Sequence, residues 1–156
     1  MCRGFTLLEL MVTVAVAAIL ATVAVPGFRD LIQNNRVTTQ TNELVTALNF
    51  ARTEAVKRGR PVDVVVTQQD PGWRAQVLVN PAGTPELLRE VNRRGSAITV
   101  NAATIRFGPT GVRVLPIAVN DFSFEMEPKT GSSARYQRCV SVGPSGQLRT
   151  TREGCP

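Results

Sequence analysis

Glu9 is the only charged residue in the apolar stretch from Phe5 to Phe28. As a helix this stretch extends about 36 Å, which is enough to cross the hydrocarbon core of a bilayer. A carboxylate inside an inserting helix costs about 2.5–3.5 kcal/mol at the membrane centre, so we expect a positive charge that compensates it. Cleavage after Gly4 supplies one, because it creates an amine at Phe5 that can pair with Glu9 of the same or a neighbouring subunit.

Arg3 and the apolar run that follows it also fit a plain secretory signal, which has a basic start and an apolar segment. Such a signal gives no reason for an acid at Glu9. The paired-charge interpretation explains this residue, because an ion pair in a dry environment is strongly directional.

The three cysteines are Cys2, Cys139 and Cys155. When residues 1–4 are removed as a leader, an even pair is left in the polar part of the chain. A cysteine pair in an extracytoplasmic domain typically forms a disulfide, so we predict a bond between Cys139 and Cys155.

Most enzymatic chemistry is excluded by residue type. The chain has no histidine, which removes the commonest general base and metal ligand, and it has no phosphate-binding loop of the G-x-x-x-x-G-K-[ST] kind. Glu125 and Glu127 suggest paired carboxylates, but a solvated sheet face explains them better. Ser141 and Ser145 have no base to activate them. We expect no enzymatic role, no cofactor and no metal site.

Only Lys57 and Lys129 are lysines among the 18 basic residues, and the formal net charge is +6. Arginine offers a planar fork of donors that fits phosphates and carboxylates, so this bias permits an anionic partner; an arginine-rich proteome from a GC-rich genome is the alternative. Four arginines gather near the C-terminus: Arg135, Arg138, Arg149 and Arg152. They form a candidate phosphate-binding strip, or they solvate a sheet edge and keep it from pairing with other edges.

Helical periodicity continues past the apolar stretch to about Arg58. Pro26-Gly27 is expected to bend or loosen the helix, because proline removes a backbone donor. One face of the second half is apolar and is expected to pack on the chain's own sheet; it contains Leu44, Ala47, Leu48, Ala51 and Ala55. The opposite face is polar and contains Asn42, Glu43, Thr46, Asn49, Thr53 and Lys57. Gly59-Arg60-Pro61 ends the helix.

From Pro61 onward the period changes from helical to two-fold. The alternation is clearest at Phe122, Phe124 and Met126, which indicates a strand with one wet face. The expected strands are 61–67, 73–79, 87–91, 97–100, 104–107, 112–115, 121–127, 134–142 and 147–151. The predicted fold class is α+β, with one long N-terminal helix packed on an antiparallel sheet.

The segment Gly4-Phe5-Thr6-Leu7-Leu8-Glu9 resembles the prepilin peptidase motif of type IV pilins and type II secretion pseudopilins. The resemblance implies that prepilin peptidase removes residues 1–4, that the amine of Phe5 is methylated, and that Glu9 registers subunits during assembly. It also implies a transmembrane and filament-core helix at 5–28, an amphipathic helix at 29–60 and a head domain at 61–156. The chain is then expected in the inner membrane with its head in the periplasm, and later in the pilus near the tip.

Two further segments, 107–111 and 139–149, resemble minor pilins of the FimT/FimU/GspH type. Three functions stay open: a minor pilin that primes or caps the pilus with other minor and major pilins, a DNA receptor for natural transformation, and a pseudopilin of type II secretion. Cys139 and Cys155 favour the pilus members. Some FimT-like pilins bind DNA through a C-terminal G-R-x-R motif; this chain has Gly146-Gln147-Leu148-Arg149, so Gln147 replaces the first arginine.

Overall fold

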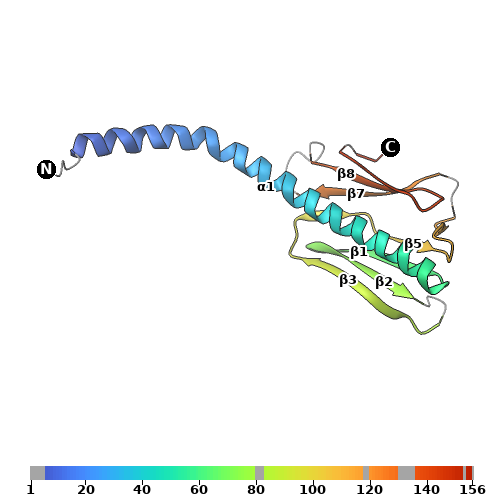
Figure 1. The fold of residues 1–156 in the computed structure, drawn as a ribbon. Helices are drawn as coiled ribbons and strands as arrows, with labels where there is room; N and C mark the ends of the chain where they lie inside the picture. Colours follow the sequence, from blue (N-terminus) through green and yellow to red (C-terminus); the bar gives the residue numbers. More distant parts are fainter. Residues whose placement is uncertain (1–5, 80–82, 118–119, 130–135, 153, 156) are drawn as a thin grey trace. The chain divides into compact units, whose positions relative to one another are not determined.

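The structure is a computed structural model that describes residues 6–79, 83–117, 120–129, 136–152 and 154–155. It contains one long helix followed by antiparallel strands (Figure 1). The elements are α1 (Leu7–Arg58), β1 (Val62–Gln69), β2 (Gly72–Val79), β3 (Glu86–Arg94), β4 (Ile98–Val100), β5 (Ala103–Phe107), β6 (Arg113–Leu115), β7 (Phe122–Pro128), β8 (Arg138–Val142) and β9 (Leu148–Thr151).

The chain divides into two compact units, one up to Asn35 and one from Arg36 onward. Helix α1 is continuous through Pro26 and Gly27, so the expected bending or loosening at this point does not end the helix. A proline in a helix removes one backbone hydrogen bond, and the bonds of the neighbouring turns are sufficient to continue the helix. Helix α1 is long and apolar enough to cross a membrane, and none of its most apolar window is buried within the chain.

From Arg36 to Arg58, α1 packs on the strands through the predicted apolar face. Leu44, Ala47, Leu48, Ala51 and Ala55 are fully buried, which confirms that face. Val37, Thr41 and Glu54 are buried as well. The polar face is exposed except at Glu43, which is half-buried. Gly59 follows the helix with φ 60°, the left-handed conformation that glycine adopts at helix ends.

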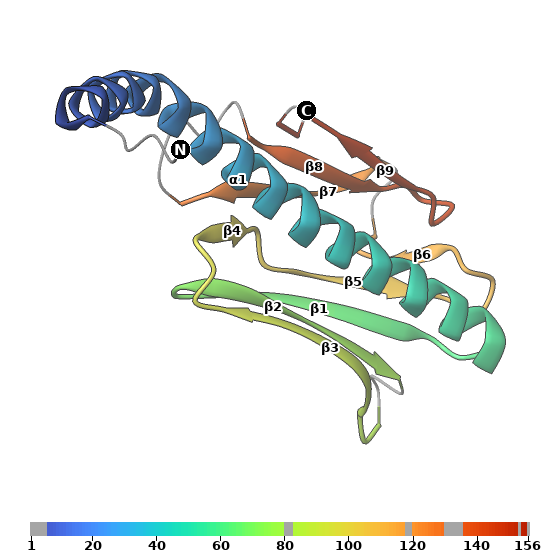
Figure 2. The ribbon, with the colours of Figure 1, turned by 60° about the vertical axis from the view of Figure 1, so that its left-hand side comes forward.

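The strands form two sheets rather than one. The first has the order β3-β2-β1-β5-β6 and the second the order β4-β7-β8-β9. Figure 2 shows α1 passing over the inner faces of both sheets. The two-fold period located the nine strands that the described residues form, but a period does not say which strands pair, because pairing joins residues far apart in the chain.

A single core joins the helix to both sheets. Trp73, Phe107 and Phe124 are its largest fully buried side chains. The indole Nε1 of Trp73 donates to Oε1 of Gln40 at 2.7 Å, so the polar end of this side chain has a partner on α1. Strand β8 begins at Arg138, later than predicted; residues 134 and 135 lie outside the described part.

Candidate functional site: the helix start, the joined turns and the disulfide-bonded tail

The first turn of α1 is capped by the residue before it. Thr6 Oγ1 accepts a hydrogen bond from the backbone N–H of Glu9 at 3.2 Å, which is the N-cap to N3 contact of a capping box. A carboxylate at this position also interacts favourably with the helix dipole. The Thr6-Leu7-Leu8-Glu9 spacing is a local signal for this cap, whereas we expected Glu9 only to pair with the amine of Phe5 and to register subunits during assembly. The contact uses the backbone of Glu9, so it caps the helix independently of the side chain at position 9.

The predicted cleavage site lies outside the described residues, at Gly4 and Phe5, so cleavage and methylation stay predictions. Glu9 is exposed on the surface of the chain, and so are the large apolar side chains around it, from Leu7 to Ile32. Within the described part of this segment no apolar side chain is buried. An apolar surface of this extent requires a partner, because contiguous exposed patches on monomers rarely exceed a few hundred Å².

The predicted disulfide between Cys139 and Cys155 is present, with 5.1 Å between the Cα atoms. Cys139 lies on β8, opposite Glu125 of β7 and Thr151 of β9. The bond brings the tail back across the outer face of the second sheet, where Sγ of Cys155 lies 3.5 Å from the carbonyl oxygen of Phe124. The disulfide therefore attaches the tail to the two central strands of this sheet.

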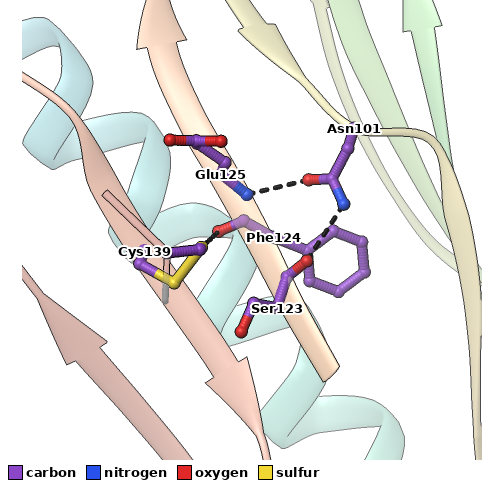
Figure 3. The surroundings of a disulfide bond; sticks show 6 residues. Asn101, Ser123, Phe124, Glu125 and Cys139 are labelled. Carbon is purple, nitrogen blue, oxygen red and sulfur yellow. Dashed lines mark hydrogen bonds between the residues drawn. A yellow bond between two sulfur atoms is a disulfide. The ribbon is translucent and has the colours of Figure 1, made fainter. Parts of the chain in front are cut away.

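Asn101 supports the same strand from its other side (Figure 3). Its Nδ2 donates to the carbonyl of Ser123 at 3.0 Å, and its Oδ1 accepts from the backbone N–H of Glu125 at 2.8 Å. The side chain thus continues the ladder between β4 and β7 by one residue, just after β4 ends at Val100. Strand β7 is therefore contacted by Asn101 on one side and lies beside the disulfide-bonded strand β8 on the other.

The four C-terminal arginines do not form one strip among the described residues. Arg135 lies outside the described part. Arg138 is buried at 7% exposure, and its Nη1 donates to the carbonyl of Gln137 at 2.9 Å. Burial lowers the pKa of the Arg138 guanidinium, and the nearby charge of Arg152 lowers it further. The expectation of a solvated phosphate-binding arginine at 138 is therefore corrected, because this side chain lies in the interior beside the core.

Arg149 and Arg152 are exposed. Arg149 pairs with Ser141, whose side chain is on the outer face of the second sheet, and Arg152 lies close enough to Arg138 to lower its pKa. Arg138 shares the inner face with Val140 and Val142, because alternate residues of a strand point to the same side. Arg149 therefore does not lie on the same face as Arg138.

Gln147 does not take the place of the missing arginine. Its side-chain amide packs over Gly143, so closely that a Cβ on that glycine would lie 2.0 Å from Nε2. Its Oε1 also accepts a hydrogen bond from the hydroxyl of Ser145. The side chain at 147 is folded back over its own turn and does not extend toward a ligand.

Two matching turns, Gly108–Gly111 and Gly143–Gly146, join the sheets. Each has a glycine at its end with φ 77°, and each closes by a hydrogen bond between its two glycines, at 2.8 and 2.9 Å. The turns contact each other, since a Cβ on Gly146 would lie 2.1 Å from the carbonyl oxygen of Gly111. The backbone N–H of Arg113 donates to Pro144 O at 3.0 Å and completes the junction.

Arg52 of α1 reaches into this junction. Its Nε donates to the carbonyl oxygen of Gly111 at 3.0 Å, and its Nη2 lies 3.5 Å from Ser145 O. One helix residue thus contacts the turn of each sheet. Arg52 was not among the residues that the sequence singled out. The repeated Gly-Pro-[Thr/Ser]-Gly pattern was the available signal, but nothing local in the sequence pairs the turns with this arginine.

Comparison with known proteins agrees with this fold. Residues 40–146 match the family model of the type II transport protein GspH, and residues 1–25 match a prokaryotic N-terminal methylation motif. A fimbrial protein of Pseudomonas aeruginosa is 33% identical over 98 residues, which are 60% of this chain and 63% of that protein. Fimbrial protein Q of Moraxella bovis is 34% identical over 110 residues, 66% of each chain. The chain thus spans somewhat under two thirds of the length of these relatives.

Among solved structures, the type IV minor pilin FimU of Pseudomonas aeruginosa is similar in fold. Its TM-score is 0.63 at 20% identity, over 78% of this chain and 92% of that chain. A second crystal form of FimU has a TM-score of 0.58. The chain therefore belongs to the GspH family of type IV pilin-like proteins, carries the N-terminal methylation motif and has the fold of a type IV minor pilin.

Proposed function

We propose that this chain is a minor type IV pilin, a structural subunit that primes or caps pilus assembly and has no catalytic role. One observation carries the proposal: the helix from Leu7 to Ile32 exposes its large apolar side chains on all sides. A monomer in water cannot sustain such a surface, whereas a membrane and then a filament core cover it in turn.

In this proposal the parts of the chain have distinct tasks. Prepilin peptidase removes residues 1–4, and the new amine at Phe5 is methylated. Residues 5–28 cross the inner membrane and later line the filament core, residues 29–60 form the amphipathic helix, and residues 61–156 form the head in the periplasm. Other minor and major pilins are the partners, and the subunit lies near the tip of the pilus.

The pilus is favoured over a secretion system by two considerations. The relatives that share 33–34% identity are described as fimbrial proteins, and the tail is closed by the Cys139–Cys155 bond. The matching family model is described as a type II transport protein. A role as a minor pseudopilin of type II secretion is therefore the competing proposal.

A role as a DNA receptor has less support from the geometry. Among the described residues only Arg149 and Arg152 of the candidate strip are exposed, and Gln147 is folded back over Gly143. Two phosphate contacts would give a slope of log affinity against log salt of about −1.8. A double variant with Arg149→Gln and Arg152→Gln tests this role. If it lost DNA uptake while pili stayed normal, the result would support a DNA-receptor function.

The proposal is tested by intact-mass analysis of the chain from sheared pili and from the membrane fraction. We expect a chain that begins at a methylated Phe5 and is present in pili at low abundance. Deletion of its gene should reduce pilus number without affecting secretion. A secretion defect with normal pili would assign the chain to the type II system instead, and a retained leader would remove the pilin function altogether.

A further inference from the structure

Most of the exposed large apolar side chains of the head gather around one turn. Among the described residues from Arg36 onward, these side chains are Val56, Leu87, Val112, Val114 and Ile117. Leu87 is on β3, whereas the other four lie at the end of α1 and along the segment that contains β6. We call these four residues (Val56, Val112, Val114 and Ile117) the apolar patch. Their side chains are between 39% and 89% exposed.

The three valines of the patch border the turn between β5 and β6. A Cβ on Gly108 would lie 2.9 Å from Cγ2 of Val114 and 3.9 Å from Cγ2 of Val112. A Cβ on Gly111 would lie 3.0 Å from Cγ2 of Val56. Valines from the helix and from the strand thus meet over two glycines, which have no side chains of their own to cover them. The patch is therefore one continuous surface that joins α1 to β6.

A cation lies at the border of the apolar patch. Arg52 is one turn before Val56 on α1, and its Nε would lie 3.3 Å from a Cβ on Gly111, the glycine that Val56 also contacts. Its Nε and Nη2 contact the carbonyl oxygens of Gly111 and Ser145. No carboxylate among the described residues forms an ion pair with Arg52. The guanidinium has five N–H donors, so it can bind a partner's carboxylate in the orientation that the two carbonyls already fix.

The apolar patch is at the end of the head where α1 ends. Figures 1 and 2 both show the turn between β5 and β6 beside the last turns of α1. From Arg36, where the compact unit of the head begins, to Val56, α1 rises about 30 Å. The patch is therefore far from the residue through which the chain enters the head.

The patch offers side chains to a partner rather than a free strand edge. Strand β6 is the last strand of its sheet, but the backbone N–H of Arg113 donates to the carbonyl oxygen of Pro144 at 3.0 Å. A partner strand cannot continue the sheet at this residue without breaking that bond. The contact is therefore made by the apolar side chains and by Arg52.

The chemistry of the patch selects the kind of partner. The four side chains are aliphatic and include no Trp or Tyr, the residues that are enriched on surfaces at a membrane interface. A second copy would bring its own Arg52 to the contact, so that like charges would meet. An apolar protein surface with a carboxylate at its border fits better, because it covers the patch and pairs with Arg52. Such an interface has about 20–30 residues on each side, so residues around the patch also take part.

We propose that the apolar patch docks the head of a different pilin, through an apolar surface that carries a carboxylate for Arg52. This inference rests on the proposed function, because it takes the partner from the pilins with which a minor pilin assembles. It deepens that function by naming the surface and the chemistry of the contact. One copy of this chain is sufficient for the contact, in agreement with a subunit of low abundance.

Cross-linking in living cells tests the contact. A photo-reactive amino acid replaces Ile117 in the full-length chain, in cells that make pili, and a second strain carries it at Leu87 as the matched position. Leu87 is 50% exposed and lies on the strand at the other edge of the same sheet. Adducts from the membrane fraction and from sheared pili are digested and identified by mass spectrometry. We expect position 117, and not position 87, to yield a peptide from the head of another pilin that contains an aspartate or a glutamate. An adduct with a second copy or with lipid, or no pilin adduct, would overturn the proposal.

Substitutions in the patch measure its contribution. The full-length chain is purified in detergent through an affinity tag, and the amount of the cross-linked pilin that accompanies it is determined. Val56→Gln with Ile117→Gln should lower this amount by about tenfold, whereas Leu87→Gln should leave it unchanged. Melting temperatures are compared in the same preparations, and Ile117→Gln alone, at the most exposed position, covers the case in which the double variant does not fold. Changing the acid of the partner's cross-linked peptide to its amide should also lower recovery. Equal recovery with the parent and the double variant would overturn the proposal.

Pilus number and secretion are measured in the same strains, so that a failure of the contact is distinguished from a failure of the proposed function. If deletion of the gene impairs secretion and leaves pili normal, the pilus role fails, and the cross-link still shows whether the patch contacts another pilin-like head. If deletion reduces pilus number but the double variant makes normal pili and recovers its partner normally, the pilus role stands and the contact is overturned.

Discussion

The guanidinium of Arg52 and the carbonyl oxygen of Gly111 form a 3.0 Å hydrogen bond that ties α1 to the turn after β5. The two residues are 59 positions apart in the chain. The same guanidinium reaches the turn of the second sheet at Ser145. Arg52 is therefore the helix residue that contacts the junction of both sheets.

Arg52→Ala should destabilise the head by about 1.5–3 kcal/mol, the usual loss for hydrogen bonds to a charged group. Arg52→Lys keeps the charge but cannot donate in both directions, so we expect an intermediate loss. Thermal unfolding of the full chain in detergent measures both. Arg36→Ala is the control, because Arg36 is an exposed arginine of the same helix. Equal stability of the Arg52 and Arg36 variants would show that the junction does not depend on Arg52.

Gly146→Ala should be more disruptive than a glycine substitution elsewhere. Its backbone has φ 77°, and a new Cβ would lie 2.1 Å from the carbonyl oxygen of Gly111, a backbone atom that cannot move independently. We expect a marked fall in the melting temperature. Gly83→Ala is the matched control, because no atom lies within 4 Å of a Cβ at that position. A Gly146 variant as stable as the Gly83 variant would contradict the contact between the turns.

Cys139→Ser with Cys155→Ser should destabilise the chain by about 3 kcal/mol, since the sequence separation of 16 is close to the 15-residue loop for which the chain-entropy model gives that value. The C-terminal residues should also become accessible to carboxypeptidase, because only the bond attaches the tail to β8 covalently. Oxidised and reduced parent chains provide the same comparison without mutation. Two thiols that react freely in the folded, periplasmically expressed chain would show that the bond does not form.

Glu9→Ala should leave a membrane protein that enters pili poorly, and Glu9→Gln tests whether the charge of the side chain is responsible. Both variants keep the backbone N–H that Thr6 caps, but neither carries a charge for an ion pair with the amine of Phe5. If the charge matters for assembly, both variants are depleted from sheared pili to a similar degree. Normal incorporation of Glu9→Gln would show that the charge of Glu9 is not needed for assembly.

We expect Glu54 to make the stability of the head depend on pH. It is buried near the end of α1, and the hydrogen bond from Arg58 at 2.7 Å lowers the pKa of its carboxyl below the ordinary value of 4.5. A lowered pKa in the folded state stabilises the fold above the ordinary value, and the contribution is lost as the pH falls through the lowered value. The melting temperature of the parent should therefore exceed that of Glu54→Gln at neutral pH, and the difference should shrink in acid. A constant difference would mean that the carboxylate charge is not involved.

The sequence by itself determined the features that depend on local patterns. The apolar run with Glu9 as its single acid predicted the exposed helix, and the apolar positions from Leu44 to Ala55 predicted its buried face, because helix periodicity is set within a few turns. The strands were located by the two-fold period, and the cysteine pair was inferred from the count of thiols. Each of these signals lies within a short segment or in the composition.

Only the tertiary structure decided which segments meet. The strands divide into two sheets because β4 pairs with β7 and not with β3, the strand before it in the chain. The two-fold period does not encode that choice. Arg138 became a buried residue because its strand position faces the core, whereas Arg149 on the next strand faces outward. Arg52 and Ser145 are 93 residues apart and are brought together by the packing of α1 over both sheets. Contacts of this kind depend on how distant segments pack, and the sequence around each residue does not indicate its partner.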